Sequence, residues 1–351
     1  MSFAPGHITI QRYLLLSAGI FIMAWGCKKD QISFAGPETI TFQKPAHFPE
    51  PVYNFENNPL TREGFELGRK LFYEPLLSAN GKVSCGSCHH QSAGFSDQGK
   101  AFSIGVDNRP GMRNSPALAN LAWYPAFMAD GGVNHIEVMP LAPITDTLEM
   151  HEDLAQVLQK LQQHPDYPAL FEKAFGSDSI TSKHFLYSLA QFMSMMVSAN
   201  SKFDRFLQDK AILSPAEQRG YELFKINCAH CHTGALTSDF SYRNNGLDIY
   251  SEDAGRARIT LKEEDHGKFK VPSLRNVALS TPYMHDGRFE SLQEVINHYS
   301  EGIQATTNLD PSLAPMHFSE EEKADLVLFL TTLTDEEYTQ HTELSDPSVL
   351  R

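Results

Sequence analysis

Basic residues are scarce in this chain of 351 residues, where 29 lysines and arginines face 43 aspartates and glutamates and leave a formal net charge of −14. A nucleic-acid-binding protein presents a basic patch or stripe, and an electrostatic hold on anionic lipid needs the same excess of positive charge. The composition therefore argues against nucleic acid as a partner and against an electrostatic attachment to membranes. The composition is compatible with a basic or neutral protein partner.

The chain also has no apolar run that would span a membrane comfortably as a helix. The run from Tyr13 to Trp25 is shorter than the roughly 20 residues that a transmembrane helix needs. It ends at Cys27, in an arrangement similar to a bacterial lipoprotein signal, whose cysteine is lipidated. We predict a lipoprotein-type signal segment at residues 1–27, a periplasmic location, and contact with a membrane only through a lipid anchor. An ordinary signal with an incidental cysteine is the alternative.

Cysteine is scarce as well, and its placement is the strongest signal in the sequence. Four of the five cysteines fall in two C-x-x-C-H motifs. Two thiols at this spacing can both bond the vinyl groups of one porphyrin, and the histidine that follows then lies beneath the iron as its proximal ligand. We therefore predict two covalently bound haem c groups. The predicted attachment residues are Cys85, Cys88, Cys228 and Cys231, and the predicted iron ligands are His89 and His232.

Two other uses of paired cysteines fit less well. A structural zinc ribbon places its two cysteine pairs roughly 15–20 residues apart, whereas these pairs lie in different halves of the chain. A thioredoxin-like redox pair needs a βαβ pattern around it, and neither motif has one. Both motifs also end in histidine, which favours haem.

Helical patterns precede both motifs and recur along the chain. Thr61 is the expected N-cap of a helix before the first motif, and the Ser-Pro-Ala-Glu sequence that begins at Ser214 is a capping box before the second. Residues 153–161 and 181–199 also have helical spacing, and Ser319 is expected to cap a closing helix that packs against an opening helix. Extended structure has little support. The predicted fold is mainly α, with two cytochrome c-like haem domains.

The repeat of a helix followed by a motif predicts the domain boundaries. After the signal segment, residues 28–58 carry several prolines without clear periodicity, and we expect an extended tether there. An N-terminal cytochrome c-like domain is expected at residues 59–203, and a C-terminal one at residues 204–351. Each domain then contains one motif and one haem.

Further landmarks lie between and after the motifs: Arg113-Asn114-Ser115-Pro116, Asp130-Gly131, Ala142-Pro143-Ile144, Leu148-Glu149-Met150, Pro272-Ser273-Leu274-Arg275-Asn276 and Pro282-Tyr283-Met284-His285-Asp286-Gly287. With these landmarks the chain resembles the bacterial diheme cytochrome c peroxidase family, including its MauG-like branch, over most of residues 59–340. The resemblance implies that the N-terminal haem reacts with hydrogen peroxide. It also implies a six-coordinate C-terminal haem that relays electrons, and a small electron-donor protein as partner.

The resemblance assigns roles around the first haem. Glu149 matches the family's distal acid, which would move a proton between the two oxygens of peroxide; a solvated glutamate at a helix start is the alternative. Val106 stands where peroxidases that need reductive activation carry a distal histidine, so the first haem is expected to be five-coordinate and open to peroxide. Met139 replaces the family's nearby glutamine. Ala129 replaces a tryptophan between the haems, for which Trp123 is a candidate substitute.

The resemblance also implies a sixth ligand for the second haem and a calcium ion between the haems. Tyr299 stands where the MauG-like branch has tyrosine and the peroxidases have methionine, and Met284 is the alternative ligand through its thioether. The calcium would bind Asn114 and backbone carbonyls near Ser280 and Pro282, since oxygen ligands suit calcium. A role of Asn114 in capping the adjacent turn is the alternative.

Three functions follow as expectations. The first is an exported diheme oxidoreductase that reduces hydrogen peroxide to water with electrons from a small redox partner. The second is a MauG-like enzyme that uses peroxide to oxidise a partner protein or an organic substrate, which Val106 and Tyr299 favour. The third is a non-enzymatic electron carrier or haem sensor, because Ala129 and Met139 stand where the family has functional side chains.

Overall fold

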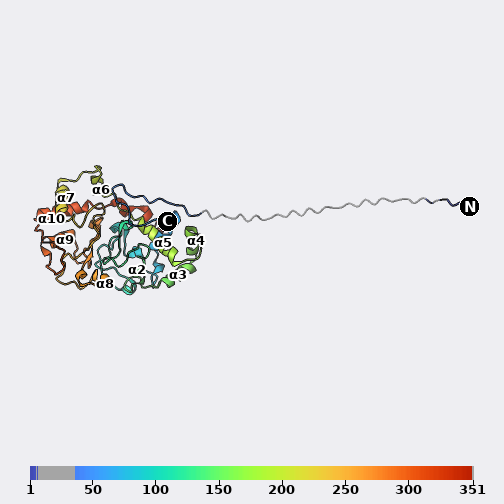
Figure 1. Ribbon diagram of the computed structural model, residues 1–351, viewed down its shortest axis with the longest axis horizontal. Coiled ribbons are helices and arrows are strands. Elements are labelled where there is room, and N and C mark those ends of the chain that lie inside the picture. The colour runs from blue at the N-terminus through green and yellow to red at the C-terminus, as the bar shows by residue number, and fades with distance from the viewer. Residues whose placement is uncertain (5, 7–35, 350–351) are drawn as a thin grey trace. The chain divides into compact units, whose positions relative to one another are not determined.

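The computed structural model describes residues 1–4, 6 and 36–349 (Figure 1). The chain from Gly36 onward forms one compact unit, in which short helices are joined by long irregular segments. Its mainly α architecture confirms the predicted fold class. The helices are α1 (Arg62–Phe72), α2 (Leu141–Thr145), α3 (Leu154–Gln163), α4 (Tyr167–Phe175), α5 (Ser182–Ser194), α6 (Lys202–Leu207), α7 (Pro215–Asn227), α8 (Ala257–Thr260), α9 (Leu292–Asn297), α10 (Glu320–Thr331) and α11 (Glu336–Gln340), and the antiparallel strands are β1 (Tyr242–Arg243) and β2 (Phe269–Lys270).

The predicted signal segment at residues 1–27, with Cys27, lies outside the described residues apart from residues 1–4 and 6. Lipid anchoring therefore stays a prediction. Within the described ranges, no helix has both the length and the apolar character needed to cross a bilayer.

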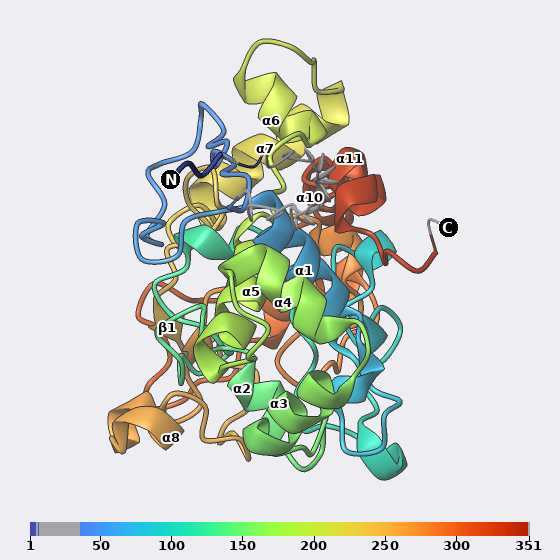
Figure 2. The ribbon, with the colours of Figure 1, turned by 90° about the vertical axis from the view of Figure 1, so that its right-hand side faces the viewer.

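The first half of the molecule is built around α1 and α5, which pack together (Figure 2). Thr61 caps α1 as predicted, because its hydroxyl accepts a hydrogen bond from Gly64 N at 3.0 Å. The helices approach closely at Gly68, where a Cβ would overlap the carbonyl oxygen of Ser188. The ring of Phe192 is fully buried beside this crossing and belongs to the first hydrophobic core.

The second half repeats this design with α7 and α10, which Figure 1 shows together at the other end of the compact unit. Ser214 and Ser319 cap these helices with capping boxes, as predicted. A Cβ on Gly220 would overlap the carbonyl oxygen of Asp325, so this crossing also depends on glycine. The prediction that a closing helix packs against an opening helix is confirmed.

The helix predicted over residues 181–199 is shorter than expected, because α5 ends at Ser194. Beyond it, the side chain of Asn120 accepts a hydrogen bond from Ser198 N at 2.9 Å and donates one to Ser198 O at 3.0 Å. Backbone groups that are bound by a side chain are not available to continue a helix. The chain therefore turns out of α5 toward α6.

Two of the three hydrophobic cores in the described residues follow the two halves of the chain, and the third lies beneath the N-terminal segment. One gathers buried side chains mainly between Phe65 and Met196, and the other between Phe203 and Leu333. The predicted boundary after residue 203 lies beside this change of core. The C-terminal segment does not follow the division, because Tyr338 and Leu344 return to the first core. The separation into domains 59–203 and 204–351 stays a prediction.

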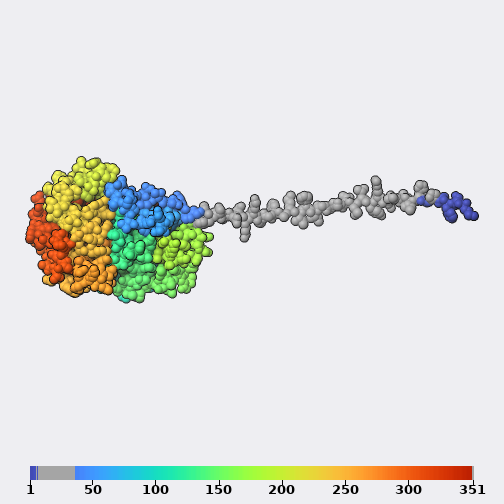
Figure 3. All heavy atoms as spheres, viewed as in Figure 1, coloured from blue at the N-terminus to red at the C-terminus, as the bar shows by residue number. Residues whose placement is uncertain are grey.

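The described part of the predicted tether, residues 36–58, is extended but docked on the protein rather than free (Figure 3, in blue). Phe48 is 3% exposed and packs against Trp123, whose indole Nε1 donates to Pro49 O at 2.8 Å. The aromatic side chains of this segment have no helical or strand periodicity, so the sequence indicated no packed structure there. In the structure they bury the segment by packing on the protein. This part of the tether prediction is therefore corrected.

The loops that follow the two motifs repeat in backbone conformation. Asn120 and Asn276 both have left-handed backbones, with φ of 58° and 62°. Eight positions later in each loop, Met128 and Met284 are also left-handed, with φ of 65° and 73°. The two halves of the molecule therefore share the conformation of their long loops as well as their helix pairs.

Candidate functional site

The first C-x-x-C-H motif forms a tight turn with free thiols. Cys85–Ser87 is a short 3-10 helix, and His89 N donates to Cys85 O at 2.9 Å. Neither Cys85 nor Cys88 is in a disulfide. The turn holds both thiols and the imidazole within one short stretch, as attachment to a single porphyrin requires.

The His89 imidazole is held by the backbone. Its Nδ1 lies 2.8 Å from Phe95 O, a distance at which a ring N–H donates to the carbonyl. Burial lowers the pKa of His89, which favours the neutral ring that a metal needs. Because Nδ1 is engaged, Nε2 is the nitrogen left to face an iron.

The second motif repeats this geometry at the end of α7. His232 N donates to Cys228 O at 2.9 Å, and His232 Nδ1 lies 3.3 Å from Thr237 O. Burial lowers the pKa of His232 to about 4, although the contact with Thr237 opposes the shift. Cys228 and Cys231 are also free of disulfides.

These donor sets fit covalent haem. Each supplies two free thiols and one neutral imidazole oriented by a backbone carbonyl. A zinc site would instead need several ligands that converge, and in the described part of the chain no three histidine, cysteine, aspartate or glutamate side chains do so.

Glu149 lies beside the first motif. After the larger effects of burial and other neighbours, its carboxylate helps to raise the pKa of both Cys85 and Cys88, which indicates that it lies in the neighbourhood of the two thiols. Burial, with a smaller contribution from Asp146, raises the pKa of Glu149 to about 7. A carboxyl group with this pKa exchanges protons readily near neutral pH.

The loop that contains Val106 passes next to Glu149. Val106 is 1% exposed, and its backbone N donates to Glu149 O at 2.8 Å. A Cβ on the preceding Gly105 would overlap the carbonyl oxygen of Leu148, so the loop lies directly against this chain. Met139 is partly buried against the same apolar core. The chain next to Glu149 therefore presents an apolar side chain at Val106 and no side-chain ligand for iron.

Tyr299 lies beside the second motif, within the π-helical segment His298–Gly302 that follows α9. Burial raises the pKa of its phenol against an opposing hydrogen bond from Asn245, and smaller contributions from Cys228 and Cys231 indicate that the phenol lies near both thiols. The wider π turn leaves Tyr299 O free to accept a hydrogen bond from Met316 N at 3.1 Å. Single π turns occur often at functional sites.

The two candidate ligands of the second haem meet at a residue that the sequence did not indicate. Asn245 Nδ2 donates to the Tyr299 hydroxyl at 3.4 Å and to Met284 Sδ at 3.5 Å. The structure therefore brings Tyr299 and Met284 together. No motif or spacing marks Asn245 in the sequence, because it lies far along the chain from both partners.

The predicted calcium residues lie on neighbouring loops. Asn114 Nδ2 donates to Lys100 O at 3.1 Å and to Ala101 O at 3.2 Å. The neighbouring Gly99 N donates to Thr281 O at 2.8 Å, which places the predicted Ser280 and Pro282 carbonyls on an adjoining strand of chain. Calcium at this place stays a prediction.

Trp123, the candidate substitute for the tryptophan missing at Ala129, is buried, and its role between the haems stays a prediction. Trp123 belongs to the core beneath the N-terminal segment. Ala129 O accepts a hydrogen bond from Lys270 N at 2.8 Å. The buried Lys270 ammonium donates to Ala126 O at 2.8 Å and lies 4.9 Å from the centre of the Tyr124 ring. Burial lowers the pKa of Lys270 to about 8.

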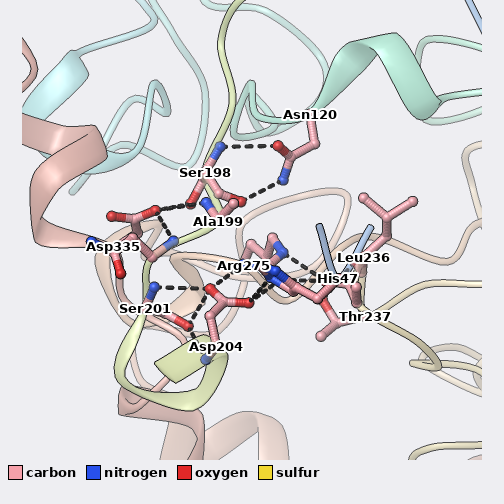
Figure 4. Close-up of polar contacts among 12 residues, drawn as sticks. His47, Asn120, Ser198, Ala199, Ser201, Asp204, Leu236, Thr237, Arg275 and Asp335 are labelled. Atoms are coloured by element: carbon pink, nitrogen blue, oxygen red, sulfur yellow. Dashed lines mark hydrogen bonds and ion pairs between the residues drawn. The ribbon is translucent and has the colours of Figure 1, made fainter. Parts of the chain in front are cut away.

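A polar network joins the two halves of the compact unit (Figure 4). Arg275 and Asp204 form a buried ion pair through two bonds of 2.6 and 2.7 Å, and Arg275 also donates to Ala235 O, close to the loop that orients His232. His47, from the docked N-terminal segment, lies 3.0 Å from the Asp204 carboxylate. The N-terminal segment, α6 and the second haem loop are therefore held at one point.

Family models and known proteins match most of the chain. A model described as "Di-haem cytochrome c peroxidase" matches residues 62–211, and one described as "Cytochrome c" matches residues 217–334. The methylamine utilization protein MauG of Methylorubrum extorquens is 38% identical over 301 residues, which cover 84% of each chain. A cytochrome c551 peroxidase of Nitrosomonas europaea is 35% identical over 281 residues, covering 78% of this chain and 80% of that protein.

A solved structure agrees with this similarity. The crystal structure of a MauG-like protein associated with microbial copper homeostasis matches with a TM-score of 0.82 and 33% identity. It covers 88% of this chain and 99% of that one. The similarity therefore extends to both motif units and the loops between them.

Proposed function

Because the chain belongs to the di-haem cytochrome c peroxidase family, with MauG proteins among its relatives, we propose that it reduces hydrogen peroxide to water with electrons from a small redox partner. The reaction takes one peroxide, two electrons and two protons to two water molecules. The observation that supports it most is the placement of Glu149 beside Cys85 and Cys88. A haem bound at His89 would supply the iron chemistry that transfers electrons to peroxide.

The residues of the two motifs hold the cofactors in this proposal. Two haem c groups would bind through the four motif cysteines, with His89 and His232 as proximal ligands. Burial favours the neutral form of each imidazole, and the backbone bonds at Phe95 and Thr237 orient the ring. Tyr299 would be the sixth ligand of the second haem iron, with Met284 as the alternative.

Glu149 moves the proton in the proposed reaction. As a carboxylate it accepts the proton from the near oxygen of peroxide, and it then donates this proton to the far oxygen, which leaves as water. Its pKa of about 7 suits both directions of transfer. Val106 is buried and apolar and provides no side-chain ligand, so peroxide would have no protein ligand to displace there.

A second function has support of its own. The 38% identity to a MauG protein and the tyrosine at position 299 favour peroxide-dependent oxidation of a partner protein or an organic substrate. The two functions differ in where the electrons come from. A peroxidase turns over with a small reduced donor alone, whereas a MauG-like enzyme turns over only when its substrate is present.

Three further features belong to this proposal. The protein would act in the periplasm, where export through the segment before Cys27 delivers it, and a lipid on that cysteine would anchor it. Calcium would bind near Asn114 with oxygen ligands from the loop that contains Ser280 and Pro282. The proposed partners are hydrogen peroxide and a small electron-donor protein or a protein substrate.

The deciding experiment is a peroxide titration of the purified full-length protein with both haems attached, followed by absorption spectroscopy and by steady-state peroxide consumption with a reduced donor. We expect a stoichiometric spectral change and turnover that falls at least about a hundredfold in Glu149→Gln, the lower end of the range that general acid–base catalysis usually contributes, roughly 10²–10⁴-fold. The exposed Glu172→Gln variant is the control. No spectral response with both haems covalently retained would contradict the proposal.

A further inference from the structure

Asn245 contacts both side chains that could ligate the second iron. Its amide nitrogen lies 3.4 Å from the Tyr299 hydroxyl and 3.5 Å from Met284 Sδ. An amide nitrogen carries two hydrogens, so it can donate to both partners at once. Only one of these two side chains can occupy a single sixth position on iron.

The loop that contains Asn245 is fixed by its neighbours. Arg243 makes ion pairs with Asp239 at 2.8 Å and with Asp310 at 2.6 Å. Asn244 Nδ2 donates to Asn308 Oδ1 at 2.8 Å. Because both residues before Asn245 are bound in this way, its amide has a defined position rather than a range of them.

The same loop also holds the segment that carries Tyr299. The His298 ring nitrogen Nε2 lies 3.1 Å from Asn245 O, within hydrogen-bonding distance. On the opposite side, His317 N donates to Ser300 O at 3.0 Å and so ties the π-helical segment to the chain before α10. The phenol and the Asn245 amide therefore face each other from two restrained segments.

We propose that Asn245 is the positioning residue that selects Tyr299 over Met284 as sixth ligand of the second haem. This inference rests on the proposed haem at Cys228 and His232. A hydrogen bond to an ionised oxygen is worth more than one to a neutral acceptor, and a thioether is a weak acceptor. The amide therefore stabilises the tyrosinate form of Tyr299, while its second hydrogen bonds one of the two lone pairs of Met284 Sδ and so weakens the thioether as an iron ligand.

The inference is tested with Asn245→Ser, whose short side chain cannot reach either partner, in the full-length protein with both haems attached. We expect the absorption and magnetic circular dichroism spectra of the second haem to shift toward methionine ligation, and its reduction potential to rise. In the double variant Asn245→Ser, Met284→Leu this shift should vanish, because the competing sulfur is gone. Asn245→Leu, which has no donor, should behave as Asn245→Ser does.

A second readout measures how firmly the sixth ligand is held. Loss of a hydrogen bond to a charged oxygen should raise the affinity of added imidazole for the second haem on the order of tenfold in the double variant. The exposed Asn54→Ser variant should leave spectrum, potential and imidazole affinity unchanged.

Unchanged spectra and potential in both Asn245 variants, with both haems retained, would overturn the inference and leave the proposed function standing. Absence of covalent haem from the second motif of the unaltered protein, shown by haem staining after denaturation, would overturn both. A spectrum that Tyr299→Phe does not alter would also overturn the selection of tyrosine.

Discussion

Asn120, from the first half of the molecule, and Asn276, from the second half, both form hydrogen bonds with Ser198. Asn120 exchanges two hydrogen bonds with the backbone of Ser198, at 2.9 and 3.0 Å. Asn276, at the equivalent place in the second loop, donates to Ser198 Oγ at 3.1 Å and accepts from Asp335 N at 2.8 Å. The two asparagines occupy equivalent places in the two loops, and both bind the connection between α5 and α6. This connection is therefore the joint between the two halves of the molecule.

The first prediction concerns the stability of that joint. Asn276→Ala removes two buried hydrogen bonds and places alanine in a left-handed backbone, so we expect a loss of about 3 kcal/mol of unfolding free energy. Asn276→Gly keeps the backbone relaxed and should lose about 1 kcal/mol less. Urea unfolding followed by far-UV circular dichroism measures both variants. Equal midpoints for Asn276→Ala and the unaltered protein would contradict the role of the joint.

The second prediction concerns pH. Burial raises the pKa of Glu149 to about 7, so its carboxylate, the form that accepts a proton from peroxide, increases as pH rises through 7. The rate of peroxide reaction should therefore rise between roughly pH 6 and pH 8 and then level off. Stopped-flow mixing of the ferric protein with peroxide across this range measures the profile.

Two variants control the pH experiment. Glu149→Gln should be slow and should lose the rise near pH 7, because an amide does not titrate there. The exposed Glu172→Gln should keep both the rate and the profile. A rise near pH 7 that persists in Glu149→Gln would assign the titration to another group.

The haem motifs could be predicted from the sequence because their chemistry is local. Cys85 and Cys88 are separated by two residues and His89 follows directly, so all three lie within one short backbone turn. The helix caps at Thr61 and Ser214 were equally local, since each cap satisfies backbone groups within its own first turn. Features of this kind depend on few distant contacts.

The rest could not be predicted because it depends on contacts between distant parts of the chain. Asn245 acquires its place only when the loop around it is fixed against Tyr299 and Met284. Trp123 likewise packs against the docked N-terminal segment through a hydrogen bond to Pro49 O, a contact between parts of the chain that are far apart in sequence. Such outcomes follow from tertiary packing, for which single residues carry no spacing signal.

The third prediction concerns the two helix crossings. Gly68→Ala and Gly220→Ala would each push a Cβ into a backbone carbonyl oxygen of the facing helix, so each should destabilise its own unit by about 1–3 kcal/mol. Gly111→Ala is the control, because a Cβ there meets its nearest atom at 3.7 Å. Thermal unfolding measures the loss, and haem content per motif shows which unit is affected. Stability equal to that of Gly111→Ala would show that the helices can separate without cost.

The fourth prediction concerns the buried pair of Asp204 and Arg275. Burial alone would raise the pKa of Asp204, but its two bonds to Arg275 lower it to about 2. A carboxyl group whose pKa is lower in the folded state stabilises the fold at pH values above its unfolded pKa, here near 3.8. This stabilisation is lost as pH falls toward 2. For Asp204 it amounts to about 2 kcal/mol of unfolding free energy. The unaltered protein should therefore lose this stability below about pH 4.

Asp204→Asn tests this account because it keeps the shape and removes the charge. Arg275 would remain 4% exposed without a counter-ion, so we expect a loss of about 3 kcal/mol at pH 7. The difference between the variant and the unaltered protein should shrink as pH falls from 4 toward 2, since protonation removes the same charge from Asp204. Urea unfolding at several pH values measures it, with the exposed Asp178→Asn as control. A difference that stays constant with pH would show that shape or packing, and not the ion pair, sets the stability of this network.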